Sequence, residues 1–119
     1  MVGARKMKQA SRNKKSQLLQ NYLRTRLLKT FRHLRPRDIR TARVGEAGSD
    51  LKMTTTAKRL IPYCFECKNA ERFSLLYNNF AQAKRYGSDT LEPVLVIKMR
   101  KRQPLVIIEA EHFFKLIKL

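Results

Sequence analysis

Three charged residues in the middle of the sequence have types and spacing suited to hydrolysis of a phosphodiester bond. Glu66 and Lys68 are two residues apart, so both side chains project from the same face of an extended strand. Asp50 ends a glycine-containing turn, from which a neighbouring strand can bring its carboxylate beside Glu66. Two carboxylates hold Mg²⁺ through oxygen ligands, and the backbone carbonyl of Cys67 is a further candidate ligand. A lysine beside them can orient or help to activate a water molecule.

The alternative is that Glu66 and Lys68 are an ordinary ion pair on the surface of a sheet, because Glu-x-Lys triplets occur in many proteins. Three observations favour the chemical interpretation. Acidic residues are scarce, with 9 Asp and Glu against 27 Lys and Arg. The segment around Glu66 is apolar, which is unusual for a solvated edge. In addition, Gly45, Gly48 and Ser49 form a tight turn that leads directly into Asp50.

The elements that must position these residues begin with a helix. Apolar residues recur at helical spacing from Ser16, a candidate N-cap, to Pro36, which ends the helix. They are Leu19, Leu23, Leu27, Phe31 and Leu34. Gln20 lies on the same side of this helix, so the spacing predicts a polar side chain facing the core.

Short apolar runs predict strands at residues 38–44, 49–53, 63–69, 93–99 and 104–108, and helical spacing recurs at residues 72–86 and 109–117. We therefore expect an α/β fold: a single domain over residues 16–119, with a central mixed β-sheet of about five strands flanked by helices. Residues 1–15 are basic and lack apolar periodicity, which predicts a flexible N-terminal arm.

Three segments resemble the PD-(D/E)XK nuclease superfamily, whose members have a restriction-endonuclease-like core. They are the run Gly48-Ser49-Asp50-Leu51, the strand from Pro62 to Asn69, which contains Phe65-Glu66-Cys67-Lys68, and the helix that carries Gln82. The resemblance covers about residues 12–119 and is closest to small phage-type endonucleases related to Holliday junction resolvases. It implies a metal-dependent DNA endonuclease that acts on branched DNA.

The resemblance assigns roles to particular residues. Asp50 and Glu66 would be the metal carboxylates for Mg²⁺, with Mn²⁺ as a substitute, and Lys68 the lysine of the motif. Many members carry a glutamate in the first helix, where this chain has Gln20. An amide contributes no negative charge, so metal binding would be weaker or a second metal absent. Ser49 and Gln82, the latter in the second long helix, would support the site, and Glu46 is an alternative carboxylate whose other interpretation is exposure to solvent.

The formal net charge of +18 over 119 residues makes a polyanion the expected partner. Lys and Arg side chains of the arm, the first helix, the glycine turn and the last hairpin are expected to contact DNA phosphates. They are Lys14, Lys15, Arg24, Lys29, Arg43, Arg100, Lys101 and Arg102. Cleavage of a four-way junction implies a homodimer, with two sites related by a two-fold axis.

Other classes of protein fit less well. The chain contains no apolar run long enough for a membrane span and no secretory signal, so we expect a cytoplasmic location, in the host cell if a phage encodes it. Cys64 and Cys67 match a C-x-x-C motif, but residues three apart in a strand face opposite ways, which favours structural cysteines over zinc or redox chemistry. Two rivals remain: a non-catalytic nucleic-acid-binding module and a basic RNA- or ribosome-associated protein.

Overall fold

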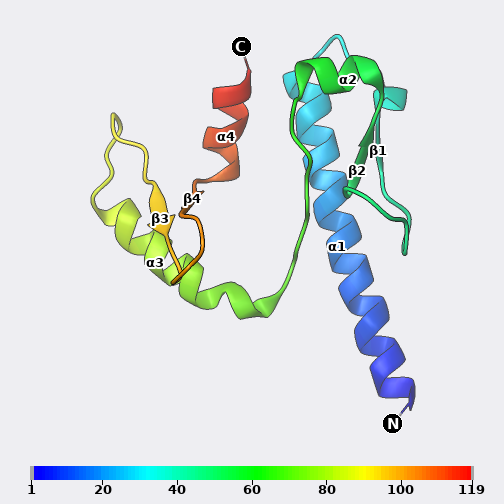
Figure 1. Ribbon diagram of the computed structural model, residues 1–119, viewed down its shortest axis with the longest axis horizontal. Coiled ribbons are helices and arrows are strands. Elements are labelled where there is room, and N and C mark those ends of the chain that lie inside the picture. The colour runs from blue at the N-terminus through cyan, green and yellow to red at the C-terminus, as the bar shows by residue number, and fades with distance from the viewer. Residues whose placement is uncertain (1, 119) are drawn as a thin grey trace. The chain divides into compact units, whose positions relative to one another are not determined.

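The computed structural model describes the backbone of residues 2–118 and the side chains of residues 14–70 and 72–118. The chain forms two compact units, Met1–Ala70 and Glu71–Leu119, and each has its own small hairpin and helices (Figure 1). Asp50, Glu66 and Lys68 all belong to the first unit.

The N-terminal unit consists of a long helix, α1 (Val2–Thr30), a hairpin of β1 (Ile39–Thr41) and β2 (Leu51–Met53), and a short helix, α2 (Thr55–Leu60). The strands are antiparallel, and Arg40 of β1 is opposite Lys52 of β2. Helix α1 contacts β1, as Figure 1 shows. The unit therefore has two layers, with the hairpin packed on one helix.

Helix α1 begins earlier than the sequence analysis placed it, at Val2 rather than Ser16. The residues before Ser16 are mostly Ala, Arg, Lys, Met and Gln, which favour helix even without an apolar face to bury. Absence of apolar periodicity therefore did not exclude a helix there. The side chains of the predicted arm before Lys14 lie outside the described residues.

The core of this unit lies between α1, the hairpin and α2. Leu27, Ile39, Leu51 and Ile61 are its largest fully buried side chains. One buried carboxylate, Asp38, joins the elements around it. Asp38, which is 9% exposed, accepts hydrogen bonds from the backbone of Arg35 and the hydroxyl of Thr54, both at 2.7 Å. Because these donors stabilise the ionised carboxylate, the pKa of Asp38 is lowered.

The C-terminal unit contains α3 (Ser74–Arg85), preceded by a 3₁₀ turn (Glu71–Phe73), then a hairpin of β3 (Leu95–Ile97) and β4 (Leu105–Ile107), and finally α4 (Ala110–Ile117). The hairpin is antiparallel, with Val96 opposite Val106. Phe80 of α3 and Phe114 of α4 are its buried apolar residues among those described.

The mixed α/β composition is confirmed, but the central mixed sheet of the restriction-endonuclease-like core is wrong. The described residues form two separate two-stranded antiparallel sheets, β1–β2 and β3–β4. The expected strand over residues 63–69 has no ladder, and residues 61–70 have no regular secondary structure. Among the described residues, one backbone hydrogen bond joins this segment to the chain just before β2, from the N–H of Asp50 to the carbonyl of Phe65.

The chain after β2 enters α2, a helix that the sequence analysis did not predict. Thr54 is its N-cap, and its hydroxyl accepts a hydrogen bond from the backbone of Ala57 at 3.3 Å. This bond satisfies one of the donors that a helix start leaves unpaired. The expected helices over residues 72–86 and 109–117 are present within one to two residues at most ends, and the last two strands are present but shorter.

Candidate functional site

A hollow of about 280 Å³ in the N-terminal unit brings together most of the residues that the sequence singled out. Its walls come from α1, the β1–β2 loop and the segment after α2. The lining residues are Ser16, Gln17, Gln20, Ala42, Arg43, Val44, Gly45, Glu46, Asp50, Glu66, Cys67 and Lys68. Gln20, Asp50, Glu66 and Lys68 therefore share one concavity, although they are far apart in sequence.

Asp50 fixes the position of the irregular segment that carries Glu66 and Lys68. Its backbone N–H donates to the carbonyl of Phe65 at 2.9 Å. Its Oδ2 accepts a hydrogen bond from the backbone N–H of Cys67 at 2.6 Å. The carboxylate thus takes the place of the missing strand partner, and only its Oδ2 is used in that bond.

Gln20 is buried in the wall of this hollow, as the helical spacing predicted, with 8% of its surface exposed. Its amide oxygen, Oε1, has no hydrogen-bond partner among the described residues. A buried acceptor without a partner costs about 1–3 kcal/mol of stability. The oxygen is therefore a candidate ligand for a cation or a water molecule.

Glu66 and Lys68 project outward from the segment, whereas Cys67 between them is buried. Their side chains form an ion pair, with Lys68 Nζ 3.2 Å from Glu66 Oε1. Both side chains are well exposed, at 62% for Glu66 and 70% for Lys68. An exposed pair of this kind adds little to stability. The exposed Glu66 and Lys68 on either side of the buried Cys67 keep the in–out alternation expected of a strand, although the segment forms no strand.

The chemistry of the hollow is that of oxygen donors. The described residues include no group of three or more His, Cys, Asp or Glu side chains that could hold a metal. The donors on offer are Gln20 Oε1, the Asp50 and Glu66 carboxylates and the backbone carbonyl of Cys67, a set that suits Mg²⁺ or Mn²⁺. The pKa of the Cys67 thiol is raised by burial and by the nearby Asp50 and Glu66 charges, which disfavours the thiolate that softer metals need.

Glu46 lines the hollow but is committed to other partners. Its two oxygens accept hydrogen bonds from the Arg40 guanidinium at 2.9 and 2.8 Å, and the backbone N–H of Arg43 donates to it at 2.9 Å. These donors lower the pKa of Glu46 to about 2. Glu46 thus holds the first part of the β1–β2 loop against β1. Because both of its oxygens already accept hydrogen bonds, it is not available as a replacement metal carboxylate.

The Glu46 pair predicts a specific acid response. Because the folded pKa of about 2 is below the ordinary 4.5, the carboxylate contributes stability above pH 4.5 and loses it as the pH falls towards 2. Replacing Glu46 with glutamine should flatten the curve of unfolding free energy against pH in that window. Asp38, whose pKa is also lowered, titrates in both proteins and cancels in the comparison. Parallel curves for wild type and Glu46→Gln, measured by denaturant unfolding, would contradict this assignment.

The remaining predicted site residues lie outside the hollow. The Ser49 hydroxyl donates to the backbone carbonyl of Leu51 at 2.8 Å and so shapes the start of β2. Gln82 is an exposed residue of α3 in the C-terminal unit and does not line the hollow. Cys64 is exposed, so the expectation of two buried structural cysteines holds for Cys67 alone.

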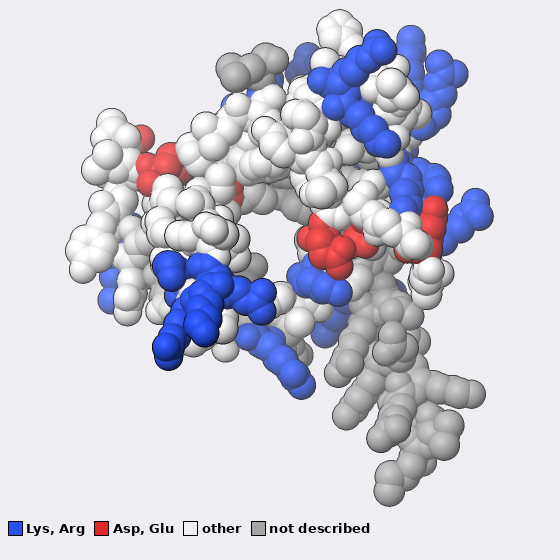
Figure 2. All heavy atoms as spheres, viewed as in Figure 1, with Lys and Arg blue, Asp and Glu red and all other residues white. Residues whose placement is uncertain are grey.

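The predicted DNA-contacting cations divide into two groups. The Arg24 side chain donates to the backbone carbonyls of Pro36, at 2.7 Å, and Ile39, so it holds α1 against the chain entering β1. The others have exposed side chains. They are Lys14, Lys15, Lys29, Arg43, Arg100, Lys101 and Arg102. Figure 2 shows Lys and Arg atoms covering parts of the face in view, with only small areas of Asp and Glu.

Two polar residues of the hollow were not predicted as site residues by the sequence analysis. Ser16 and Gln17 line it beside Gln20. Gln17 donates to Asn21 Oδ1 at 3.2 Å and to Thr41 Oγ1 at 2.9 Å, which ties α1 to the end of β1. The available signal was helical spacing, since residues three and four apart share one face of a helix.

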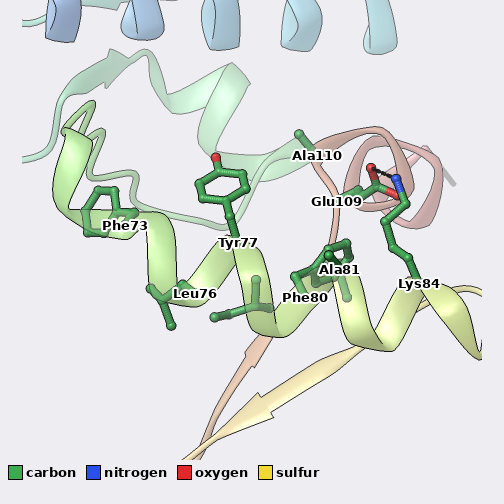
Figure 3. A pocket seen from close by; sticks show the side chains of 10 residues that line it. Phe73, Leu76, Tyr77, Phe80, Ala81, Lys84, Glu109 and Ala110 are labelled. Atoms are coloured by element: carbon green, nitrogen blue, oxygen red, sulfur yellow. Dashed lines mark hydrogen bonds and ion pairs between the residues drawn. The ribbon is translucent and has the colours of Figure 1, made fainter.

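The C-terminal unit has a hollow of its own, of about 690 Å³ and mainly apolar. Figure 3 shows Phe73, Leu76, Tyr77 and Phe80 along α3, with the Lys84–Glu109 ion pair at one end. This hollow contains no arrangement of paired carboxylates or of a nucleophile with a base. It therefore offers an apolar surface and no evident catalytic chemistry.

Among the described residues, none of the helices is both long and apolar enough to cross a membrane. Comparisons of the chain with protein-family models, curated proteins and solved structures found no match.

Proposed function

We propose that the protein is a divalent-metal-dependent nuclease that hydrolyses phosphodiester bonds in DNA, with the Asp50, Glu66 and Lys68 arrangement that resembles the PD-(D/E)XK nucleases. The observation that carries the proposal is the buried, unpartnered oxygen of Gln20 in the same hollow as the Asp50 and Glu66 carboxylates. Such an oxygen costs stability unless something binds it. A cation among oxygen donors explains why this polar group is retained in a small core.

The donor types that line the hollow suit a hard divalent cation. Gln20, Asp50 and Glu66 would hold it through oxygens, together with the carbonyl of Cys67. When bound, a divalent cation supplies charge that stabilises the negative charge developing on a phosphate. The site resembles the family pattern in its carboxylates and lysine and departs from it at Gln20, whose neutral oxygen favours weaker metal binding.

The side chains of the chain itself then have separate tasks. Lys68, an exposed ammonium beside Glu66, can donate a hydrogen bond to an attacking water or to a phosphate oxygen. Arg43, exposed at the wall of the hollow, would bind a neighbouring phosphate. The excess of Lys and Arg attracts the polyanion to the site.

A second candidate is supported by the same geometry. More than half of each of the Glu66 and Lys68 side chains is exposed, and the two neutralise each other in an ion pair. A basic binding module that has no catalytic activity would show this arrangement too. The two candidates differ in whether the hollow binds a divalent cation and whether bound DNA is cut.

The test is a cleavage assay on supercoiled plasmid and on a synthetic four-way junction, with linear duplex as competitor at a stated salt concentration. The proposal predicts cleavage with Mg²⁺ or Mn²⁺ and none with a chelator. Preference for the junction, together with a dimer in solution, would support symmetric cutting of branched DNA by two copies of the site. DNA binding without cleavage under any of these metal conditions would reject the nuclease and support the binding module.

A further inference from the structure

The β3–β4 hairpin of the C-terminal unit ends in a turn with an unusual charge. Residues 98–104 connect the strands, and the N–H of Arg102 donates to the carbonyl of Met99 at 3.1 Å, which closes the turn. Four cations occupy this connection: Lys98, Arg100, Lys101 and Arg102. No Asp or Glu occurs in residues 93–108. Figure 2 shows Lys and Arg atoms gathered where Figure 1 places this turn.

The cations at this turn are exposed and have no acidic partner. In the part of the chain that the structure describes, none of the four forms an ion pair, whereas Lys84 in the same unit pairs with Glu109. Four neighbouring positive charges repel one another unless an anion lies between or beside them. Charge complementarity therefore indicates a polyanion at the hairpin tip, and a surface that repels a second copy of itself.

One of these cations occupies a backbone conformation that does not favour it. Lys101 has φ of 63°, and it is the only described non-glycine residue with a positive φ. Lys101 is the third residue of the Met99–Arg102 turn, the position at which a type II turn prefers glycine. A lysine at positive φ is strained relative to glycine, so the turn has a positive charge at residue 101 at a cost in backbone conformational energy.

Apolar side chains next to the tip are exposed as well. Met99, at the first corner of the turn, is 72% exposed. Val96 and Val106, directly opposite each other in the two strands, are 62% and 63% exposed. Exposed apolar side chains thus lie next to the four cations at one end of the hairpin, a combination suited to apolar base edges flanked by phosphates.

We propose that the β3–β4 hairpin is a two-stranded ribbon that enters the major groove of duplex DNA, with Lys98, Arg100, Lys101 and Arg102 on the flanking phosphates and Met99 against the bases. The major groove, about 12 Å wide, admits a two-stranded β-ribbon. The inference rests on the proposed function only in taking DNA as the partner. It deepens that proposal, because it assigns groove binding to an element outside the catalytic hollow.

The test measures binding of the full chain to a short DNA duplex by fluorescence anisotropy, in chelator and at several salt concentrations. Lys101→Gly removes a charge but relieves the positive-φ strain, so the proposal predicts weaker binding by a protein that unfolds at the same or a higher temperature. The slope of log affinity against log salt should fall by about 1. Lys115→Ala, which removes one charge at an exposed position of α4, is the control and should change the salt slope less than Lys101→Gly does.

Met99→Ala should weaken binding several-fold without changing the salt slope, and should remove protection of guanine N7 from dimethyl sulfate, a major-groove probe. Equal binding to an RNA duplex would overturn groove entry, because the deep, narrow major groove of A-form RNA excludes side chains. Equal salt slopes for Lys101→Gly, Lys115→Ala and wild type would also overturn it. Since these assays use chelator, their outcome is independent of whether the protein cuts DNA.

Discussion

Replacing Asp50 with asparagine is expected to lower metal-dependent DNA cleavage by about 100-fold or more, because several kcal/mol of charge stabilisation depend on the carboxylate. Asparagine keeps an oxygen acceptor for the backbone N–H of Cys67, which donates to Asp50 Oδ2 at 2.6 Å. The irregular segment should therefore stay in place while the negative charge is lost. Cleavage is measured on plasmid with Mg²⁺ or Mn²⁺, and folding by thermal unfolding.

Two further variants separate chemistry from structure at this position. Asp50→Ala removes the acceptor as well as the charge, and leaving the Cys67 N–H without its partner should cost about 1–3 kcal/mol of unfolding free energy. Asp89→Asn makes the same change at an exposed residue of the C-terminal unit and should leave cleavage unaltered. Cleavage by Asp50→Asn at the wild-type rate would remove Asp50 from the active site.

Replacing Gln20 with leucine is expected to raise the unfolding free energy of the metal-free protein by about 1–3 kcal/mol, because a buried acceptor without a partner is removed. The same variant should lose any stabilisation of the wild-type protein by Mn²⁺ or Mg²⁺. Gln17→Leu is the matched control. Gln17 lines the same hollow, but its amide donates to Asn21 and Thr41, so its loss should destabilise.

Gln20→Glu should behave in the opposite way. A buried carboxylate without a partner destabilises the metal-free protein, whereas a bound cation repays that penalty. Added Mn²⁺ should therefore raise the unfolding temperature of Gln20→Glu more than that of wild type, as expected for a ligand that binds only the folded state. If Mn²⁺ shifts neither protein, the hollow is not a metal site, whatever the cleavage assay shows.

Local sequence signals predicted α3, α4, the C-terminal half of α1 and the short strands of the hairpins, because each depends on nearby residues, but they did not predict α2. The spacing from Leu19 to Leu27 identified the buried side of α1, and Gln20 is buried there as expected. The prediction of a central sheet was wrong because strand pairing depends on contacts between segments that are far apart in sequence. The alternation of Phe65, Glu66, Cys67 and Lys68 is typical of a strand, but alternation alone does not supply a neighbour to pair with.

The candidate site was predictable in its members and only partly in its geometry. Chemical type and spacing selected Asp50, Glu66 and Lys68, and the structure brings them to one hollow with Gln20. The Arg40–Glu46 pair was not foreseen, because the turn that brings Glu46 back to Arg40 depends on the left-handed backbone at Gly45, where φ is 79°. Neither composition nor spacing indicated that Arg24 holds α1 to the chain around Pro36.

Under the proposed function, Asp50 combines a structural task with a chemical one. The same carboxylate fastens a segment that has no strand ladder and is a proposed ligand of the active site. Few residue types can replace aspartate at such a position. Glutamate would keep the charge but displace the acceptor by a methylene, and asparagine would keep the acceptor but lose the charge. Substitution at residue 50 is therefore constrained both by the structure and by the proposed chemistry, whereas substitution at exposed Glu66 is constrained by the proposed chemistry alone.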